Sequence, residues 1–275
     1  MKTLLITGAR GLLGAHLVPL LGGSWEVVAL DRPAANLSRP LDPASLPPRV
    51  DAVVHLAQSG RFRDFPDGAR DMFEVNLARL AELLDFARRA GAGHFVHAST
   101  GSVYARSTAP LAEEIPTAPR RAFGFYAATK RAGELLAQSY APFMSVVSLR
   151  YFFIYGPRQR SDMLVPRLIE SVRSGKPVTL QGEDGLRLNP VHADDAAAAT
   201  AAALGLESSA IINVAGPETL SIRAMAEAIG ERLGVQPRFE RSPGEAADLV
   251  GDTARMAALL MPPRGRFRVP VGELL

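Results

Sequence analysis

The sequence contains no cysteine among its 275 residues. A disulfide framework, a thiolate metal site and a cysteine nucleophile are therefore excluded. Long apolar runs are also missing, since no stretch approaches the ~18 consecutive apolar residues of a membrane-spanning helix. We therefore expect a protein of a reducing compartment, the cytoplasm, with no membrane partner.

Strong charge of one sign is absent as well. The net charge is only +3, and no long basic run occurs, so a nucleic-acid partner is not expected. Lysine is scarce: Lys2, Lys130 and Lys176 are the only lysines, and the other basic residues are arginines. The five histidines never fall at a metal-binding spacing on one helix face, so we expect no metal site.

Short apolar runs alternate with helical patterns in the first half of the chain. Amphipathic or helix-periodic segments lie at Leu12–Leu21 and Phe73–Ala90. Near-continuous apolar runs predict buried strands at Leu4–Ile6, Val27–Leu30, Ala52–Leu56, His94–Ala98 and Ser145–Leu149. Such alternation predicts a doubly wound α/β fold, with a parallel sheet covered on both faces.

Two regions depart from this regular alternation. The proline-rich stretch from Asp31 to Asp51 has no room for a full helix and strand, so one crossover is expected to be a loop. The second half predicts a helix at Asp195–Leu204, a strand at Ile211–Val214 and a helix at Ile222–Leu233. We expect a dinucleotide-binding domain at residues 1–155 and a small substrate lobe at 156–275, interleaved with the last sheet strands.

A glycine-rich turn follows the first predicted strand. Gly8, Gly11 and Gly14 stand in a GxxGxxG spacing that opens a helix, which lets backbone N–H groups approach a pyrophosphate. Asp31 ends the second strand, where a carboxylate accepts hydrogen bonds from an adenosine ribose diol. This carboxylate repels a 2′-phosphate, so NAD is the expected cofactor. NADP stays open because Arg10 and Arg32 lie close enough to favour a 2′-phosphate.

A tyrosine and a lysine stand four residues apart in Tyr126-Ala127-Ala128-Thr129-Lys130, on one face of a helix. A cation nearby favours the phenolate, so such a tyrosine can take or return the proton of a substrate hydroxyl. Upstream, the hydroxyl-rich Ser99–Ser102 follows a buried strand, at the sheet edge where ligands bind. These residues predict hydride chemistry with a nicotinamide cofactor.

These motifs resemble the extended short-chain dehydrogenases, the NAD-dependent epimerase/dehydratase family that includes UDP-glucose/galactose 4-epimerase-like proteins. The resemblance runs nearly end to end, through TGARGLLG, VVHLAQ, HASTGSVY, YAATK, LRYFFIYGPRQR, RLNPVHADD and NVAGPETLS. It implies an NAD-binding Rossmann fold and a homodimer formed through helices around Tyr126–Ser139 and Phe73–Ala90. It also implies that Thr100 hydrogen-bonds the substrate oxygen, that Tyr126 is the acid and base, and that Lys130 holds the nicotinamide ribose.

The same resemblance defines the expected contact sets. The cofactor-binding set comprises Gly8, Arg10, Gly11, Leu12, Leu13, Gly14, Asp31, Arg32, Asn36, Leu37, Leu56, Ala57, Gln58, Asn76, Ala98, Ser99, Tyr126, Lys130, Tyr151 and Phe153. The substrate-binding set comprises Thr100, Gly101, Ser102, Tyr126, Phe153, Arg158, Arg160, Arg187 and Arg241.

The substrate itself stays open. Phe153 replaces the asparagine that diphosphate-binding relatives usually carry, and Ser242 falls where an arginine is common, with Arg241 adjacent. Gly101-Ser102 follows Thr100 instead of an acidic pair, which disfavours 4,6-dehydration. The sequence therefore predicts an epimerase of a sugar or nucleotide sugar. A net NAD(P)-dependent dehydrogenase or reductase of a small sugar, sugar acid or keto-sugar is the alternative, and a non-catalytic dinucleotide sensor comes last.

Overall fold

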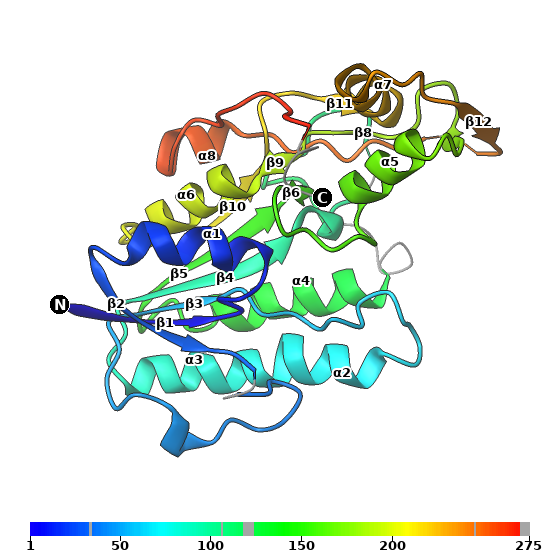
Figure 1. Ribbon diagram of the computed structural model, residues 1–275. Helices are drawn as coiled ribbons and strands as arrows, with labels where there is room; N and C mark the ends of the chain where they lie inside the picture. Colours follow the sequence, from blue (N-terminus) through cyan, green and yellow to red (C-terminus); the bar gives the residue numbers. More distant parts are fainter. Residues whose placement is uncertain (33–34, 106, 118–123, 245, 270–275) are drawn as a thin grey trace.

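A computed structural model describes residues 1–32, 35–105, 107–117, 124–244 and 246–269. Its centre is a six-stranded parallel sheet with the strand order β10-β5-β4-β3-β1-β2 (Figure 1). The strands are β1 (Lys2–Thr7), β2 (Trp25–Leu30), β3 (Ala52–His55), β4 (His94–Thr100), β5 (Ser145–Tyr151) and β10 (Ala210–Val214). The predicted doubly wound α/β fold is confirmed.

Helices cover both faces of the sheet because successive strand residues point to opposite sides. Leu4 and Ile6 pack with α1 (Leu12–Leu21) and α6 (Ala193–Ala203) on one face. Leu5, between them, packs with α3 (Arg79–Arg89) on the other face. Each fully buried leucine contributes roughly 1.5–3 kcal/mol relative to an exposed one.

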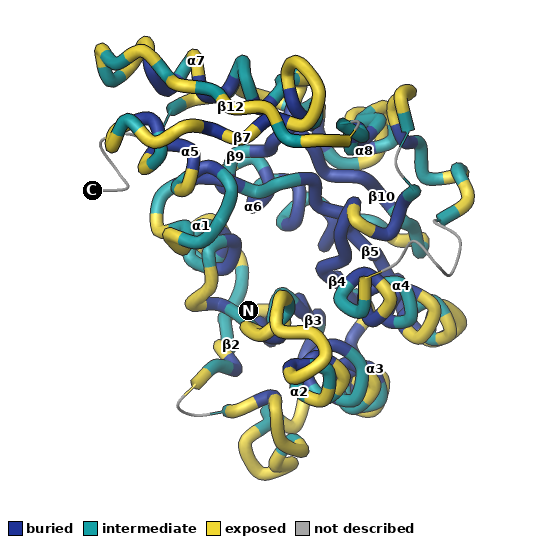
Figure 2. Tube along the Cα trace, turned by 90° about the vertical axis from the view of Figure 1, so that its right-hand side faces the viewer, coloured by how far each residue is buried: buried dark blue, intermediate teal, exposed yellow. Residues whose placement is uncertain are grey.

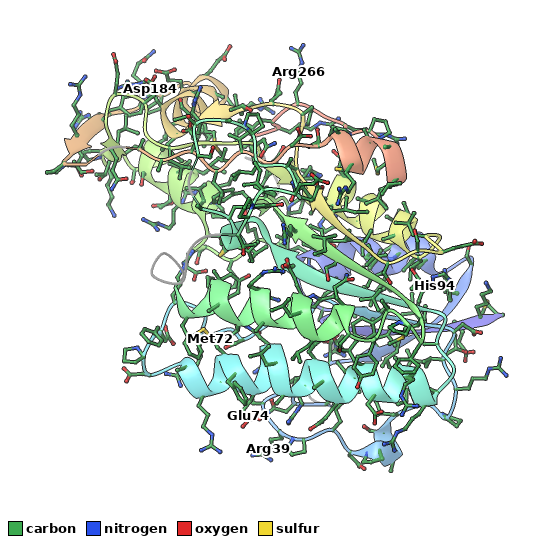
Figure 3. All side chains as sticks on the ribbon, turned by 180° about the vertical axis from the view of Figure 1, so that it is seen from behind. Arg39, Met72, Glu74, His94, Asp184 and Arg266 are labelled. Carbon is green, nitrogen blue, oxygen red and sulfur yellow. The ribbon has the colours of Figure 1, made fainter. Side chains whose placement is uncertain are left out.

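The second helix layer also contains α2 (Ala69–Phe73) and α4 (Phe125–Gln138). Seen from behind, side chains fill the space between this layer and the sheet, and Met72 of α2 has no exposed surface (Figure 3). The expected single helix Phe73–Ala90 is wrong in one respect. A π-helical turn, Glu74–Ala78, separates α2 from α3. The sequence pattern did not indicate it, because one wide turn leaves the apolar spacing on either side intact.

The expected trimmed crossover is present. Between β2 and β3, the described residues form only a short 3₁₀ turn, Pro43–Ser45. β3 consequently pairs with β1 on the side opposite to β2. The chain therefore reverses its direction across the sheet at β1, and the carboxyl ends of β1 and β3 flank a topological switch point, where α/β proteins bind ligands.

The chain after β5 forms a smaller second core. There α5 (Leu164–Arg173) and α7 (Ile222–Leu233) pack on a parallel pair formed by β7 (Val178–Gln181) and β12 (Phe239–Ser242). In the turned view, these elements lie together beyond one edge of the central layers (Figure 2). The remaining short elements are β6 (Ile154–Tyr155), β8 (Arg187–Leu188), β9 (Val191–His192), β11 (Leu220–Ser221), α8 (Ala254–Leu259) and a 3₁₀ turn at Gly101–Val103.

Not all of the second half belongs to this smaller core. Both β10, which completes the central sheet, and α6, which covers it, come from residues after 155. The strand expected at Ile211–Val214 and the helices expected at Asp195–Leu204 and Ile222–Leu233 are confirmed, with small shifts in their bounds. In the described ranges, the helices are all too short or too polar to cross a membrane.

Candidate active site

The turn between β1 and α1 depends on two glycines. Gly8 has a φ of 74°, and a Cβ there would lie 2.8 Å from the backbone nitrogen of Ala57. A Cβ on Gly14 would lie 2.3 Å from the Gly8 carbonyl oxygen. Both contacts exclude a side chain, so the turn stays tight and α1 begins against it at the N-cap Gly11. The unpaired N–H groups of the first turn of α1 form a site for an anion such as a pyrophosphate.

Asp31 shapes the same turn from the end of β2. Its carboxylate accepts hydrogen bonds from the backbone N–H of Gly8 (2.8 Å) and of Arg10 (3.0 Å). The Arg10 guanidinium in turn donates to the Arg32 carbonyl (3.2 Å). Asp31 therefore has a structural task besides the ribose contact predicted for it.

A cleft of about 1010 Å³ runs along the carboxyl ends of the strands. Pockets for small molecules usually measure ~300–1000 Å³, so this cleft can hold a dinucleotide together with a substrate. Most of the predicted site residues line it: Gly8, Arg10, Gly11, Leu12, Leu13, Gly14, Asp31, Arg32, Asn36, Leu37, Leu56, Ala57, Gln58, Ala98, Ser99, Thr100, Ser102, Tyr126, Lys130, Tyr151, Phe153, Arg158 and Arg160.

Four predicted residues do not line the cleft. Asn76 lies behind it, where its side chain accepts from the Ser59 backbone N–H and donates to the Thr129 hydroxyl, each at 3.0 Å. Gly101 is buried against Phe152. Of the other two, Arg187 begins β8. Arg241 lies within β12.

Arg187 is engaged elsewhere. Its guanidinium donates to Asp248 through Nε (2.9 Å) and Nη2 (2.6 Å), and its backbone N–H donates to the same carboxylate. These hydrogen bonds hold the pKa of Asp248 below its ordinary value. The Arg187 side chain, which was predicted to bind substrate, thus holds Asp248 against β8.

Tyr126 lies in the first turn of α4 and reaches into the cleft. Its hydroxyl donates to the Gln58 side-chain oxygen (2.9 Å), and the Phe62 ring lies 5.5 Å from its ring. Burial raises the pKa of Tyr126 to about 12, and the nearby Thr100 hydroxyl opposes this rise. The phenol is therefore protonated at neutral pH in this geometry and is positioned between two polar partners.

Lys130 lies one turn further along α4 and is almost completely buried. Its ammonium donates to the Ala98 carbonyl oxygen near the end of β4 (2.9 Å). Burial lowers the pKa of Lys130 to about 8, while the negative charge of Glu134 opposes the change. The side chain thus remains mainly cationic at neutral pH on the wall of the cleft.

The sequence reasoning missed one wall of the cleft, the segment Ser59–Arg63. Arg63 spans the cleft mouth and donates to the carbonyl (2.8 Å) and carboxylate (3.1 Å) of Asp162. Arg160 donates to the same carboxylate through two nitrogens, at 3.0 Å each. The position of this segment directly after β3, at the predicted sheet edge, was the signal that could have identified it.

The residues present fit a dinucleotide. The glycine turn excludes side chains where backbone N–H groups must approach a diphosphate, and Lys130 and Tyr126 line the same cleft. Among the described residues, no group of three or more potential metal ligands is found. Together the fold and the cleft define a dinucleotide-binding α/β enzyme.

The family can be stated more closely. Residues 4–215 match the model of the NAD dependent epimerase/dehydratase family, and the chain belongs to this family of enzymes. The predictions that the protein is an enzyme and that its cofactor is NAD are thereby confirmed at the level of the family.

Curated relatives carry epimerase names. The UDP-glucuronate 4-epimerase of Thermodesulfobacterium geofontis (strain OPF15) is 30% identical over 198 residues, which make up 70% of this chain and 59% of that enzyme. This match spans less than two thirds of that relative's length. The uncharacterised UDP-glucose epimerase YtcB of Bacillus subtilis (strain 168) is 28% identical over 291 residues, covering 94% of this chain and 91% of YtcB.

Solved structures agree with this placement. The UDP-glucuronic acid 4-epimerase from Bacillus cereus, in complex with NAD, is 25% identical and superimposes with a TM-score of 0.83. The comparison covers 99% of this chain and 97% of that one.

Proposed function

We propose that this protein interconverts epimers of a nucleoside diphosphate sugar, with NAD held in the cleft and Tyr126 acting as acid and base. The observation that carries the proposal is the position of the Tyr126 hydroxyl. It faces the cleft between the Thr100 hydroxyl and Gln58, one helical turn before the buried Lys130. The named relatives act on, or are named for, UDP-sugars.

Bound NAD would supply reversible hydride transfer at a substrate carbon. Tyr126, as its phenolate, would take the proton of the hydroxyl on that carbon as the carbon becomes a ketone, and would give the proton back when the ketone is reduced from its other face. The Lys130 ammonium on the same helical face favours the phenolate form of Tyr126. Thr100 holds the substrate oxygen close to Tyr126.

The proposed substrate end of the cleft is rich in arginine. Arg61, Arg63, Arg158 and Arg160 line it, and a guanidinium has five N–H donors, so donors remain beyond those bound to Asp162. A diphosphate is the anion that such a cluster suits. We propose that these arginines hold it, in place of Arg187, which Asp248 already occupies.

A second candidate is a net reductase or dehydrogenase of a small sugar with exchangeable NAD(P). Phe153 lining the cleft favours this candidate, because an apolar ring stands where a diphosphate donor was expected. The two candidates differ in cofactor handling. Mass spectrometry of the denatured, purified protein separates them: stoichiometric NAD retained through purification supports the epimerase, and its absence supports the reductase.

The catalytic assignment is tested with Tyr126→Phe. Turnover of UDP-glucose or UDP-glucuronate, followed by NMR of the sugar anomeric proton, should fall by about 100- to 10,000-fold, while NAD binding is retained. Tyr140→Phe, just after the same helix, is the matched control and should leave turnover unchanged. Equal turnover in Tyr126→Phe and the native protein would refute the acid–base role.

The anion assignment is tested by calorimetry with UDP. Arg160→Gln should weaken UDP binding by about tenfold, which corresponds to ~1.4 kcal/mol. Arg187→Gln should leave the affinity unchanged, because this side chain lies outside the cleft and is held by Asp248. The reverse pattern would place the diphosphate at Arg187 instead.

We also propose the division of the chain near residue 155 into a cofactor-binding part and a substrate lobe, and a location in the cytoplasm.

We further propose a homodimer. Large apolar side chains are exposed on or next to the helices α2 and α4, with Phe73 51%, Leu135 59% and Phe143 63% exposed. Sedimentation equilibrium tests the dimer, and Leu135→Glu should convert it to a monomer.

A further inference from the structure

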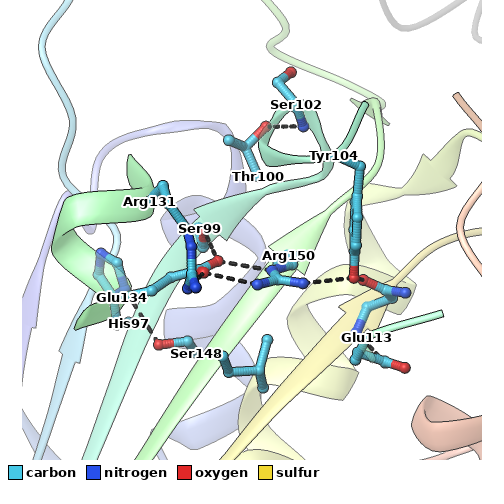
Figure 4. A network of polar contacts seen from close by, with 12 residues as sticks. His97, Ser99, Thr100, Ser102, Tyr104, Glu113, Arg131, Glu134, Ser148 and Arg150 are labelled. Carbon is cyan, nitrogen blue, oxygen red and sulfur yellow. Dashed lines mark hydrogen bonds and ion pairs between the residues drawn. The ribbon is translucent and has the colours of Figure 1, made fainter. Parts of the chain in front are cut away.

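A fully buried carboxylate lies one turn beyond Lys130. Glu134 has no exposed surface and accepts four hydrogen bonds (Figure 4). The donors are the Ser99 hydroxyl (2.6 Å), the Arg150 Nε and Nη2 (2.8 Å each) and the Arg131 Nη1 (2.9 Å). Arg150 itself is 2% exposed. The cluster therefore ties α4 to the ends of β4 and β5.

The network continues beyond Arg150. Arg150 donates to the Tyr104 hydroxyl (2.6 Å), which donates to the side-chain oxygen of Asn213 on β10 (2.9 Å). Burying an ion pair gives little net stability, since apolar residues of equal volume stabilise a fold at least as well. The placement of these charges beside the cleft therefore needs another explanation.

Glu134 has two connections to Lys130. The first acts through space: Glu134 lies four residues after Lys130 on the same face of α4, where its negative charge favours the ammonium. The second runs through Ser99, whose hydroxyl is bound by Glu134 and whose neighbour Ala98 accepts the Lys130 ammonium with its carbonyl oxygen. Ala98, Ser99 and Lys130 all line the cleft.

We propose that Glu134 is a positioning residue of the active site, which keeps Lys130 as a correctly placed ammonium and fixes the end of β4 against it. This inference rests on the role proposed above for Lys130 in the cleft. Glu134 touches neither substrate nor cofactor; it acts through Lys130 and Ser99.

The charges around Lys130 support this role. The titratable and charged groups that face Lys130 or Glu134 come from four elements: His55 on β3, His97 on β4, Arg150 on β5, and Tyr126 and Arg131 on α4. Burial and the charge of Lys130 lower the pKa values of both His55 and His97, so these rings are neutral. Glu134 is the carboxylate that opposes the lowering of the Lys130 pKa.

The lysine content of the chain makes a direct test feasible. With only Lys2, Lys130 and Lys176 in the sequence, protein grown on lysine labelled with ¹³C at Cε gives three NMR signals. Lys130→Arg assigns the buried one, and its chemical shift against pH reports the pKa of Lys130 in the cofactor-free protein. No turnover is required, so the measurement is independent of the substrate and of the proposed reaction.

Glu134→Gln should lower the Lys130 pKa by roughly one unit, a tenfold smaller ratio of ammonium to amine at a given pH. Glu134→Asp, which keeps the charge, should restore most of the difference. Arg131→Gln is the matched control: it removes another partner of Glu134 but leaves the carboxylate, so the pKa of Lys130 should not fall. An unchanged Lys130 pKa in Glu134→Gln would overturn the proposal.

Glu134→Gln leaves Arg150 buried without its partner, which can prevent folding. The double variant Glu134→Gln/Arg150→Met removes both charges and keeps the volume. It should fold and still lower the Lys130 pKa, by less than the single variant because a nearby cation is lost as well. A folded double variant with the native Lys130 pKa would equally refute the positioning role of Glu134. Loss of UDP-sugar turnover in these variants, with no change in the Lys130 pKa, would bear only on the proposed function.

Discussion

At the scale of single residues, Asp31 combines two tasks that are usually considered separately. Its two carboxylate oxygens accept the N–H groups of Gly8 and Arg10, so the side chain shapes the glycine turn before any ligand is bound. The same carboxylate lines the cleft beside Arg32. We therefore expect substitution of Asp31 to affect the turn and, if it contacts the ribose as predicted, the choice between NAD and NADP.

Asp31→Asn retains one of the two acceptors of the turn and removes the charge. We expect the preference for NAD over NADP to fall by about tenfold, or ~1.4 kcal/mol, because a 2′-phosphate is no longer repelled beside Arg10 and Arg32. Fluorescence titration with both cofactors measures the ratio. Asp31→Ala, which also removes the acceptor, should weaken binding of both cofactors; an unaltered ratio in Asp31→Asn would contradict the predicted ribose contact.

The positions of site residues were predictable where a local motif carried them. The glycine turn, Thr100, Tyr126 and Lys130 all line the cleft as expected. Contacts between residues far apart in the sequence were not predictable, because no regular spacing of residues indicates them. Arg187 and Asp248 are 61 positions apart, and no motif in the sequence predicts that they pair.

At the scale of elements, the strands followed from their apolar runs, because both faces of the sheet are covered. The π-helical turn Glu74–Ala78 could not be predicted in this way. It places Asn76 between the Ser59 backbone and Thr129 of α4, a polar arrangement that hydrophobic spacing does not register. The start of α6 also shifted, because the His192 ring caps the helix by accepting from the Asp194 N–H.

The paired strands β3 and β4 carry two stacked histidines, His55 and His97, with ring centres 6.2 Å apart. Burial lowers the pKa of His97 to about 3 and that of His55 well below its ordinary value of 6.5. The unfolded chain therefore binds more protons, and stability falls as the pH drops below about 6.5. Each histidine contributes a slope of up to about 1.4 kcal/mol per pH unit.

Urea unfolding at pH 7.5 and at pH 5.5 measures this dependence. The free energy of unfolding should decrease at pH 5.5, and His97→Gln should make the decrease smaller. His94→Gln, at the partly exposed start of β4, is the control and should retain the native difference. A native protein equally stable at both pH values would show that the histidine pair does not resist protonation.

At the scale of the whole molecule, the central sheet is completed by β10, which follows part of the smaller core and α6 in the sequence. Ile212 and Val214 of β10 are fully buried, and α6 covers the same face. A fragment of residues 1–155 would expose the flank of β5 and part of this core. We expect the fragment not to fold cooperatively, although it contains the glycine turn, Tyr126 and Lys130.

Circular dichroism and urea unfolding of this fragment test the prediction, with a fragment of residues 1–215, the part that ends just after β10, as the control. The longer fragment should recover a cooperative transition. A cooperative transition in the shorter fragment would show that the first 155 residues are an autonomous domain.

The late arrival of β10 also matters during synthesis of the chain. A ribosome releases the glycine turn and α4 early, yet the strand that completes their sheet emerges only after residue 214 has left the exit tunnel. Until then, β5 presents an unpaired edge that a second nascent chain can bind. Translation speed between residues 156 and 214 should therefore influence how much of the newly made protein reaches its native form.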